Sequence, residues 1–510
     1  MTTWLLIAWW PFVGAWALAD RLFAERCVNL RCGASQTVPY VGPQRLLWLG
    51  LAGFVVLTVA WWLDRERPRR PVVVAERSVP FGRRAVWWST AIGVVAAAHL
   101  FLVSPLTGWM PCTVPIAVGP GLGYPFNCDS PLFLHLAHHP EQVLDPGNER
   151  QSRPGYVALS AVATAVLGPP TDVLGLDSLY GQTDTAFVPL VLINLVVAVV
   201  AVALLVILLL RLGAPPVVSA LLGALAVANP LTKAYYWAPH QQMFALLTPV
   251  VSVLIGRWLW LRRPAWWVVA LIGSGLGLGL LVYGNLLVLL GTGLVVLLFP
   301  ARPTPAASEP VGGEPVRVPG RGRDWLDRIG RAAMFAATGL IPTVVWIAVC
   351  EKVAGSYYSH ELVAYHQFIW LWEASRYGLR STVDALNLAT AETAGQFIEV
   401  LWPVAGLLLV ALVAARVAGI SIGPRTREQK ATLVALGLTT LMSVGLLWSI
   451  GLWAFRLTYT LLPLFLIAIG WVAARLVRGS PRWATGTVVV RGAFVAVWLT
   501  VLVRMEGPYS

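Results

Sequence analysis

Long apolar segments follow one another along most of this chain, and they restrict it to a helical membrane protein. Hydrophobic residues make up 57% of the 510 residues, against 12% charged residues. The interior of a bilayer offers no hydrogen-bond partner to the backbone, so helices and closed barrels are the structures that cross it, and long apolar runs are typical of helices. We therefore predict an all-α, polytopic membrane fold and exclude a soluble globular one.

A hydropathy window of about 19 residues predicts about thirteen transmembrane helices. Their expected ranges are 3–19, 46–63, 86–104, 187–210, 214–229, 239–256, 265–282, 285–300, 332–353, 396–415, 431–452, 457–474 and 486–503. A Pro-, Gly- and Arg-rich stretch without apolar periodicity predicts a flexible linker. The expected organisation is two helices with an Arg-rich loop in 1–85, a core in 86–300, the linker in 301–331 and a C-terminal bundle in 332–510.

The arginines predict which side of the membrane each loop occupies. Loop 64–85 is rich in arginine, which is typical of cytoplasmic loops. Counting helices from it places the other Arg-rich loops on the same side, the N-terminus in the cytoplasm, and loops 105–186 and 354–395 outside. The net charge of +13 therefore follows from topology and does not indicate a nucleic-acid partner. The expected location is a bacterial plasma membrane.

Four of the five cysteines fall in the expected outer segments, and Cys350 lies in an expected helix. Disulfides are expected in an oxidising compartment. Short loops favour pairing Cys27 with Cys32 and Cys112 with Cys128, and free thiols are the alternative.

The segment Asn127–Pro154 is the main polar interruption of the apolar pattern. Its charged residues and histidines are Asp129, His135, His138, His139, Glu141, Asp145, Glu149, Arg150 and Arg153. Such groups beside a bilayer are costly unless water or a polar ligand meets them, so the segment predicts a functional site. Further along, Tyr156–Leu167 is apolar but only about twelve residues long, which predicts a helix lying on the outer membrane surface.

Together these features resemble the GT-C superfamily of polyprenyl-phosphate-sugar-dependent membrane glycosyltransferases. The matching features are Asp129 soon after helix 86–104, the turn RPGY at 153–156 into an apolar helix, and Arg456 at the outer end of the segment FRLTYTLLPLFLIAIG. The resemblance covers roughly residues 86–475 and makes 86–300 the expected catalytic core.

The resemblance implies a site that opens outward and moves a sugar from a polyprenyl-phosphate donor to a cell-envelope glycan, lipid or protein. Asp129 matches the acid that serves as general base toward the acceptor hydroxyl in such enzymes, and the departing phosphate needs positive charge. The candidate cations are Arg456, Lys233, Lys352, Arg153 and Arg150.

Each of these residues also has a purely structural alternative. Asp129 can cap a helix, because a Ser-Pro pair follows it as at a helix start. Arg150 and Arg153 can pair with Glu149 and Asp145 as a structural latch, and Arg456 can be an anchor at the membrane interface.

The next outer loop, PLTKAYYWAPHQQ, departs from the family pattern because relatives often have a second acid there and this loop has no carboxylate. The missing acid leaves metal dependence open. No cofactor is firmly indicated; if a divalent metal binds, His135 and His138 are weak candidate ligands. His240 is a candidate catalytic base, since the unperturbed pKa of histidine lies near neutrality. Tyr236 and Trp237 can stack on a sugar or belong to the interfacial aromatic belt.

Loop 354–395 is the second large outer excursion. Five of its residues fall near one face of a helix: Glu361, Tyr365, Ile369, Trp372 and Arg376. The loop is therefore expected to place an amphipathic helix either over the first loop's site, where His360 and Glu361 would contact substrate, or on the membrane surface.

A membrane glycosyltransferase is the leading hypothesis. A transporter or flippase for a lipid-linked or anionic substrate is the alternative; the glycine-rich segment 273–284 favours it, and the scarcity of charges within the expected helices opposes it. A noncatalytic assembly protein, whose outer loops bind a partner, is the third.

Overall fold

The computed structural model describes residues 113–119 and 122–478, with gaps at 228–231, 233–234, 263, 300–320, 364, 418 and 451–454, and a few helical positions between 86 and 94. The predicted helices 3–19, 46–63 and 486–503 lie outside the described residues, as does most of 86–104. The described chain divides into two units. One contains residues of Arg83–Ser359 and Gly423–Ser443, and the other contains His360–Ile422 and residues of Val444–Val497.

The transmembrane helices predicted between 187 and 474 are all helices in the structure. They are α7 (Phe187–Leu212), α8 (Pro216–Val227), α10 (Phe244–Leu261), α11 (Trp266–Leu280), α12 (Leu287–Leu298), α13 (Arg321–Val353), α16 (Leu379–Val417), α17 (Arg427–Ile450) and α19 (Leu462–Arg478). Among the described residues, six helical segments are long and apolar enough to cross a membrane, and three shorter apolar helices accompany them. The helical membrane fold is confirmed, and the protein is an integral membrane protein.

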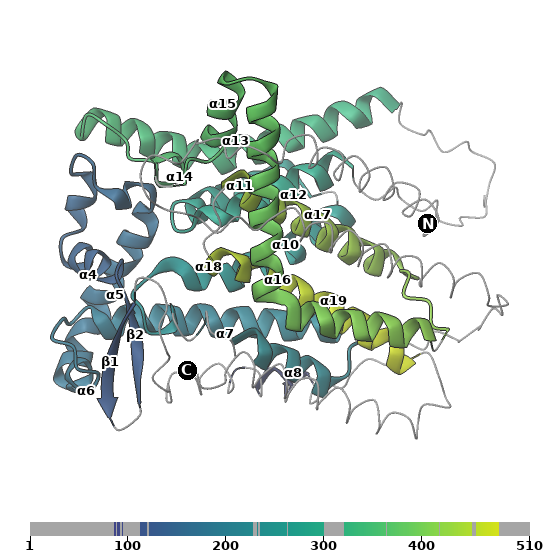
Figure 1. The fold of residues 1–510 in the computed structure, drawn as a ribbon, viewed down its shortest axis with the longest axis horizontal. Coiled ribbons are helices and arrows are strands. Elements are labelled where there is room, and N and C mark those ends of the chain that lie inside the picture. Colours follow the sequence, from purple (N-terminus) through teal and green to yellow (C-terminus); the bar gives the residue numbers. More distant parts are fainter. Residues whose placement is uncertain are drawn as a thin grey trace. The chain divides into compact units, whose positions relative to one another are not determined.

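In the first unit, α10, α11, α12 and α13 contribute to one apolar cluster, and α7 packs against α8 and α10 (Figure 1). Buried side chains such as Val269, Leu290 and Phe335 belong to one cluster. α11 approaches α13 closely because a glycine faces it: a Cβ at Gly277 would lie 2.7 Å from the carbonyl oxygen of Gly339. α13 therefore belongs with α7–α12, whereas the boundaries expected from the sequence assigned 332–353 to the C-terminal bundle.

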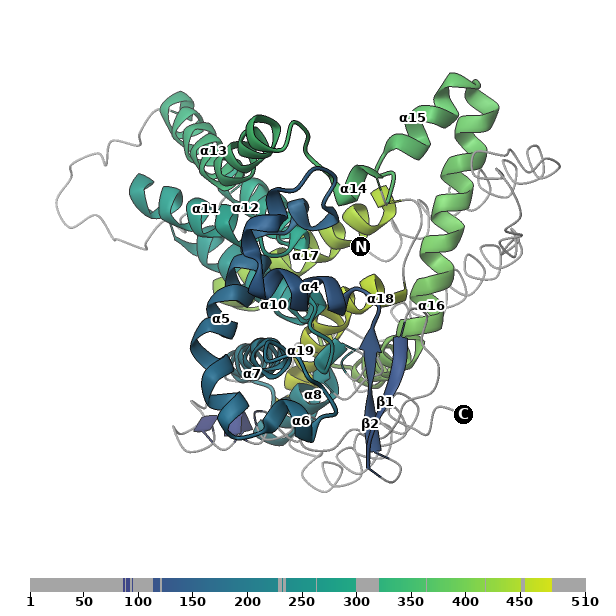
Figure 2. The ribbon, with the colours of Figure 1, turned by 90° about the vertical axis from the view of Figure 1, so that its left-hand side faces the viewer.

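The polar segment between residues 105 and 186 contains a β-hairpin that the all-helical prediction did not include. β1 (Thr113–Gly119) and β2 (Leu122–Asn127) pair antiparallel, with Thr113 opposite Asn127. The second strand, LGYPFN, contains Gly and Pro, which are depleted in strands, so it has no clear strand pattern. Figure 2 shows the hairpin beside α4 (Ser130–His138), which begins three residues after it and is followed by η1 (Pro140–Leu144) and η2 (Glu149–Ser152).

The apolar helix of the first loop is longer than expected. α5 (Pro154–Val173) has 20 residues, whereas the sequence suggested about twelve, and the short α6 (Leu176–Leu179) follows it. The sequence-based estimate stopped before Pro169 and Pro170, but the helix continues through both. Proline lacks an amide hydrogen, yet its φ angle fits a helix, and packing of α5 against α4 and α7 supports the continuation.

The start of α5 is fitted tightly against the end of α11. The amide of Gly155 donates to the carbonyl oxygen of Leu281 (3.0 Å), and a Cβ at Gly155 would lie 2.9 Å from Val282 Cγ2 and 3.0 Å from the Leu281 carbonyl carbon. Gly155 is therefore needed for backbone approach, which gives the RPGY turn a packing role.

We expect Gly155→Ala to lower stability by about 1–3 kcal/mol, because the added methyl group meets backbone atoms that cannot rotate away. Thermal unfolding in detergent measures the effect. Gly275→Ala is the matched control, since a Cβ there meets nothing within 4 Å. Equal melting temperatures for the two variants would contradict the packing role.

In the second unit, α16 packs along α19, and the rings of Phe397 and Phe465 lie 5.5 Å apart. α14 (His360–Val363) and α15 (Ile369–Arg376) precede α16, and α18 (Phe455–Thr458) and η5 (Tyr459–Leu461) precede α19.

The segment before α16 does not form the single amphipathic helix that the sequence suggested. His366 (φ 48°) and Phe368 (φ 59°) adopt the left-handed backbone conformation, which separates α14 from α15. The Phe368 amide and the Trp370 indole each donate to the carbonyl oxygen of Ser449 (both 2.9 Å), which holds this turn in place. Trp370 is the buried aromatic residue of α15, whereas Trp372, one of the five residues predicted to share a helical face, is 66% exposed.

Candidate active site

Asp129 lies at the N-cap position of α4, but its side chain does not cap the helix. Its backbone amide donates to Asn127 Oδ1 (2.9 Å), so the side chain of Asn127 fixes the turn between β2 and α4. The Asp129 carboxylate is thereby left to other partners, and its side chain is 27% exposed. The capping role that the sequence left open is not observed.

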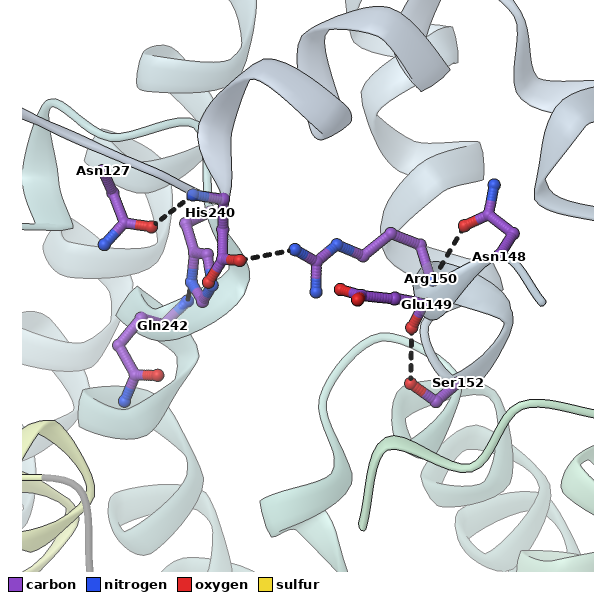
Figure 3. A network of polar contacts seen from close by, with 8 residues as sticks. Asn127, Asn148, Glu149, Arg150, Ser152, His240 and Gln242 are labelled. Carbon is purple, nitrogen blue, oxygen red and sulfur yellow. Dashed lines mark hydrogen bonds and ion pairs between the residues drawn. The ribbon is translucent and has the colours of Figure 1, made fainter. Parts of the chain in front are cut away.

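The first partner of the Asp129 carboxylate is Arg150. Arg150 Nη2 lies 2.7 Å from Asp129 Oδ1, and the Arg150 side chain is only 5% exposed (Figure 3). Its guanidinium carbon lies 4.7 Å from the ring centroid of Phe133, and its backbone amide donates to Asn148 Oδ1, which caps η2. Arg150 thus pairs with Asp129, whereas the structural alternative expected it to pair with Glu149 or Asp145.

Gln151 fastens η2 to the far end of α13 and the residues after it. The indole of Trp346 donates to the Gln151 carbonyl oxygen, and the amide of Tyr358 donates to Gln151 Oε1, both at 2.6 Å. Gln151 is fully buried. These contacts, which the sequence pattern did not indicate, hold the short helix that carries Arg150.

The second partner of the carboxylate is His240, whose Nε2 lies 3.4 Å from Asp129 Oδ2. Its other ring nitrogen, Nδ1, accepts a hydrogen bond from the amide of Gln242 (3.0 Å) and so carries no proton. The neutral ring therefore has its proton on Nε2, directed at Asp129. His240 acts as a hydrogen-bond donor here, so this geometry does not support the role of catalytic base that the sequence suggested.

These contacts hold the pKa of Asp129 well below its usual range. The hydrogen bond from His240 is the largest cause, and the positive charge of Arg150 acts in the same direction, while partial burial opposes both. Asp129 is therefore a carboxylate at any physiological pH.

The lowered pKa predicts how stability depends on pH. An unfolded aspartate has a pKa of about 3.9, so the stabilising contribution of Asp129 is complete above that value and is lost as the pH falls toward the lower folded-state pKa. We expect thermal unfolding midpoints of the wild type and Asp129→Asn to differ by a constant amount from pH 8 to about pH 5, and to converge below about pH 4. A difference that closes between pH 7 and 5 would contradict this assignment.

The histidines of α4 bind other groups. His135 Nε2 lies 2.6 Å from Gln142 Oε1, and His138 Nε2 lies 2.9 Å from Asp184 Oδ1. Within the part of the chain that the structure describes, no group of three His, Cys, Asp or Glu side chains could hold a metal ion. The structure thus gives the weak metal candidates His135 and His138 no common site with Asp129.

Tyr236 and Trp237 are buried, with exposures of 1% and 4%. Trp237 stacks on Tyr124 of the hairpin (centroids 5.5 Å) and contacts Tyr180 (4.9 Å). Neighbouring rings cover Trp237 and neither residue is at the surface, and contact of the two residues with sugar stays a prediction.

The candidate phosphate ligands lie in different parts of the chain and differ in exposure. Arg153 is 9% exposed and donates to the Ser152 carbonyl oxygen (2.8 Å), whereas Lys352 is exposed in the last turn of α13. Lys233 lies outside the described residues, as does the side chain of Arg456. His360 and Glu361 belong to α14 in the second unit.

Cys128, next to Asp129, is disulfide-bonded, and Cys350 is a buried free thiol. The hairpin register, which ends with Thr113 opposite Asn127, supports Cys112 as its partner. That pairing stays a prediction, because Cys112, Cys27 and Cys32 lie outside the described residues.

The sequence matches no family profile and no curated protein. A structure search matches the archaeal oligosaccharyltransferase AglB from Archaeoglobus fulgidus, solved in complex with an inhibitory peptide and a dolichol-phosphate. Identity is 10% and the TM-score 0.40, over 82% of this chain and 56% of that chain. This chain therefore spans little more than half the length of that protein. Because the TM-score is low, we draw neither fold nor function from this likeness.

Proposed function

We propose that this protein is a membrane glycosyltransferase of the GT-C type, which transfers a sugar from a polyprenyl-phosphate donor to a cell-envelope glycan, lipid or protein. Reaction on the extracytoplasmic face of a bacterial plasma membrane, with the N-terminus in the cytoplasm, is part of the proposal. The observation that carries it is the Asp129 carboxylate, which is partly exposed and held ionised by Arg150 and His240.

Asp129 would accept the proton of the acceptor hydroxyl as that oxygen attacks the anomeric carbon. Arg150 contacts Oδ1 at 2.7 Å, and the contact between His240 and Oδ2 is longer, at 3.4 Å. We place the acceptor hydroxyl at Oδ2, on the carboxylate oxygen with the longer of these two contacts. A carboxylate of low pKa is a weak base, but phosphate is a good leaving group, so a weak base suffices.

The departing lipid phosphate requires positive charge. Among the described candidate ligands in the unit that contains Asp129, Lys352 is exposed, whereas Arg150 is buried and already paired. Lys352 is therefore the first residue to test for donor binding. Arg153, Lys233 and Arg456 stay proposed phosphate ligands, and His360 and Glu361 stay proposed acceptor contacts.

Reconstitution into liposomes tests the proposal against the transporter alternative. The purified protein is supplied with a polyprenyl-phosphate donor carrying a radiolabelled sugar, in vesicles that also contain crude envelope acceptors. We expect label to leave the polyprenyl lipid and appear in acceptor. Movement of intact donor between leaflets without cleavage of the sugar–phosphate bond would support a flippase and reject the transferase.

A further inference from the structure

Asn194 is a fully buried carboxamide within α7, in the apolar sequence LINLV. The helix around it has a mean hydropathy of 3.3 over its most apolar window. A polar side chain in such a helix is unfavourable unless it finds partners inside the protein, and for that reason it marks a position with a specific task.

The partners of Asn194 are three backbone carbonyl groups of one short segment. Asn194 Nδ2 lies 3.1 Å from the carbonyl oxygens of Tyr235 and Tyr236 and 2.7 Å from that of Ala238. Three acceptors around one nitrogen identify it as the NH₂ group of the amide. The segment leads directly to His240 and is irregular after Tyr236, so its carbonyl groups need donors from elsewhere.

We propose that Asn194 is the positioning residue of the Asp129 site: its amide group fixes the segment 235–238, and through it the imidazole of His240 opposite the Asp129 carboxylate. No part of Asn194 touches the carboxylate, so it acts through His240. That the position of His240 matters for catalysis rests on the proposed function. That Asn194 holds His240 in place does not depend on that function.

The hydrogen bonds of His240 depend on the position of its imidazole ring. Its Nε2 faces Asp129 and its Nδ1 accepts from Gln242, while the rings of Tyr235 and Phe133 lie 5.4 and 5.6 Å away. Arg150 is the charged group on the other side of the carboxylate. If the segment shifts, Asp129 keeps Arg150 but loses its donor from His240.

The first experiment measures His240 without any substrate. Hydrogen–deuterium exchange at the C2 carbon of each histidine, followed by mass spectrometry, reports the exposure and titration of individual imidazoles. We expect slow exchange at His240 in the wild type, since it is 3% exposed. In Asn194→Leu, exchange should be severalfold faster and its pH profile should approach that of a free histidine, with a midpoint of about 6.5.

Two further variants make this result specific. Asn194→Ala removes the whole carboxamide without adding apolar bulk, so it should release His240 as Asn194→Leu does. Thr292→Val is the control, because Thr292 is an equally buried polar residue that contacts Thr439 of α17. If Asn194→Leu yields no folded protein, Asn194→Ala provides the same test. Unchanged exchange in a folded Asn194 variant, or an equal increase in Thr292→Val, would overturn the proposal.

The second experiment asks whether Asn194 acts through His240. With a donor that the wild type turns over, Asn194→Leu should lower kcat/KM by about 10–100-fold, as expected for a misplaced catalytic geometry. In the background of His240→Ala the same change should have little further effect, because the group it positions is already gone. Additive losses would refute the coupling. Faster His240 exchange together with an inactive wild type would leave the positioning intact and reject the transferase instead.

Discussion

Asp129→Asn is expected to lower the rate of sugar transfer by about 10²–10⁴-fold while the protein stays folded. Asparagine has nearly the same shape as aspartate, but it is not a base and cannot take the proton of the acceptor hydroxyl. The 2.7 Å contact with Arg150 also loses its charge, so some loss of stability accompanies the change. Initial rates with a labelled polyprenyl-phosphate donor at saturating concentration measure the effect.

Glu149→Gln is the matched control for this experiment. It makes the same chemical change next to Arg150 in η2, on a side chain that is exposed. We expect its transfer rate and melting temperature to stay close to those of the wild type. Full activity of a folded Asp129→Asn protein would remove Asp129 from the mechanism.

Arg150→Met is expected to cause the largest loss of stability among single changes at the site. The Arg150 side chain is 5% exposed, and its removal leaves the Asp129 carboxylate without its closest partner. Breaking a buried ion pair costs about 3–5 kcal/mol, and partial exposure of Asp129 reduces this to about 2–3 kcal/mol. Methionine preserves packing against Phe133, so the loss reflects charge rather than a cavity. Thermal unfolding in detergent at neutral pH measures it.

The double variant Asp129→Asn with Arg150→Met separates charge pairing from packing. With both charges absent no unpaired ion is left, so we expect it to unfold at a higher temperature than Arg150→Met alone. Arg211→Met, at the exposed end of α7, is the control for loss of an arginine. A double variant less stable than either single variant would show that the pair does not determine stability here.

The elements predicted best were those whose signal is local. Each apolar run between 187 and 474 became a helix, because a backbone in a bilayer must satisfy its own hydrogen bonds within about 20 residues. The hairpin was missed because LGYPFN lacks strand alternation, and the length of α5 was missed because the helix extends beyond the apolar run that ends at Leu167.

The candidate site was found in the sequence as a polar interruption, but its chemistry was not. The sequence allowed both a base and a helix cap for Asp129, and its side-chain partners, Arg150 at 21 positions away and His240 in another loop, could not be read from neighbouring residues. The sequence suggested that His240 is a base. In the structure Nδ1 accepts a hydrogen bond from the Gln242 amide, which makes Nε2 the donor.

By itself the sequence determined that this is a helical membrane protein and that Asp129 lies in the main polar interruption of its apolar pattern, because hydropathy and charge are properties of neighbouring residues. Only the tertiary structure decided the partners of the carboxylate, the burial of Tyr236 and Trp237, and the link from Asn194 to His240. These depend on distances of a few ångströms between helices far apart in the chain, and such distances are set by packing of the whole bundle.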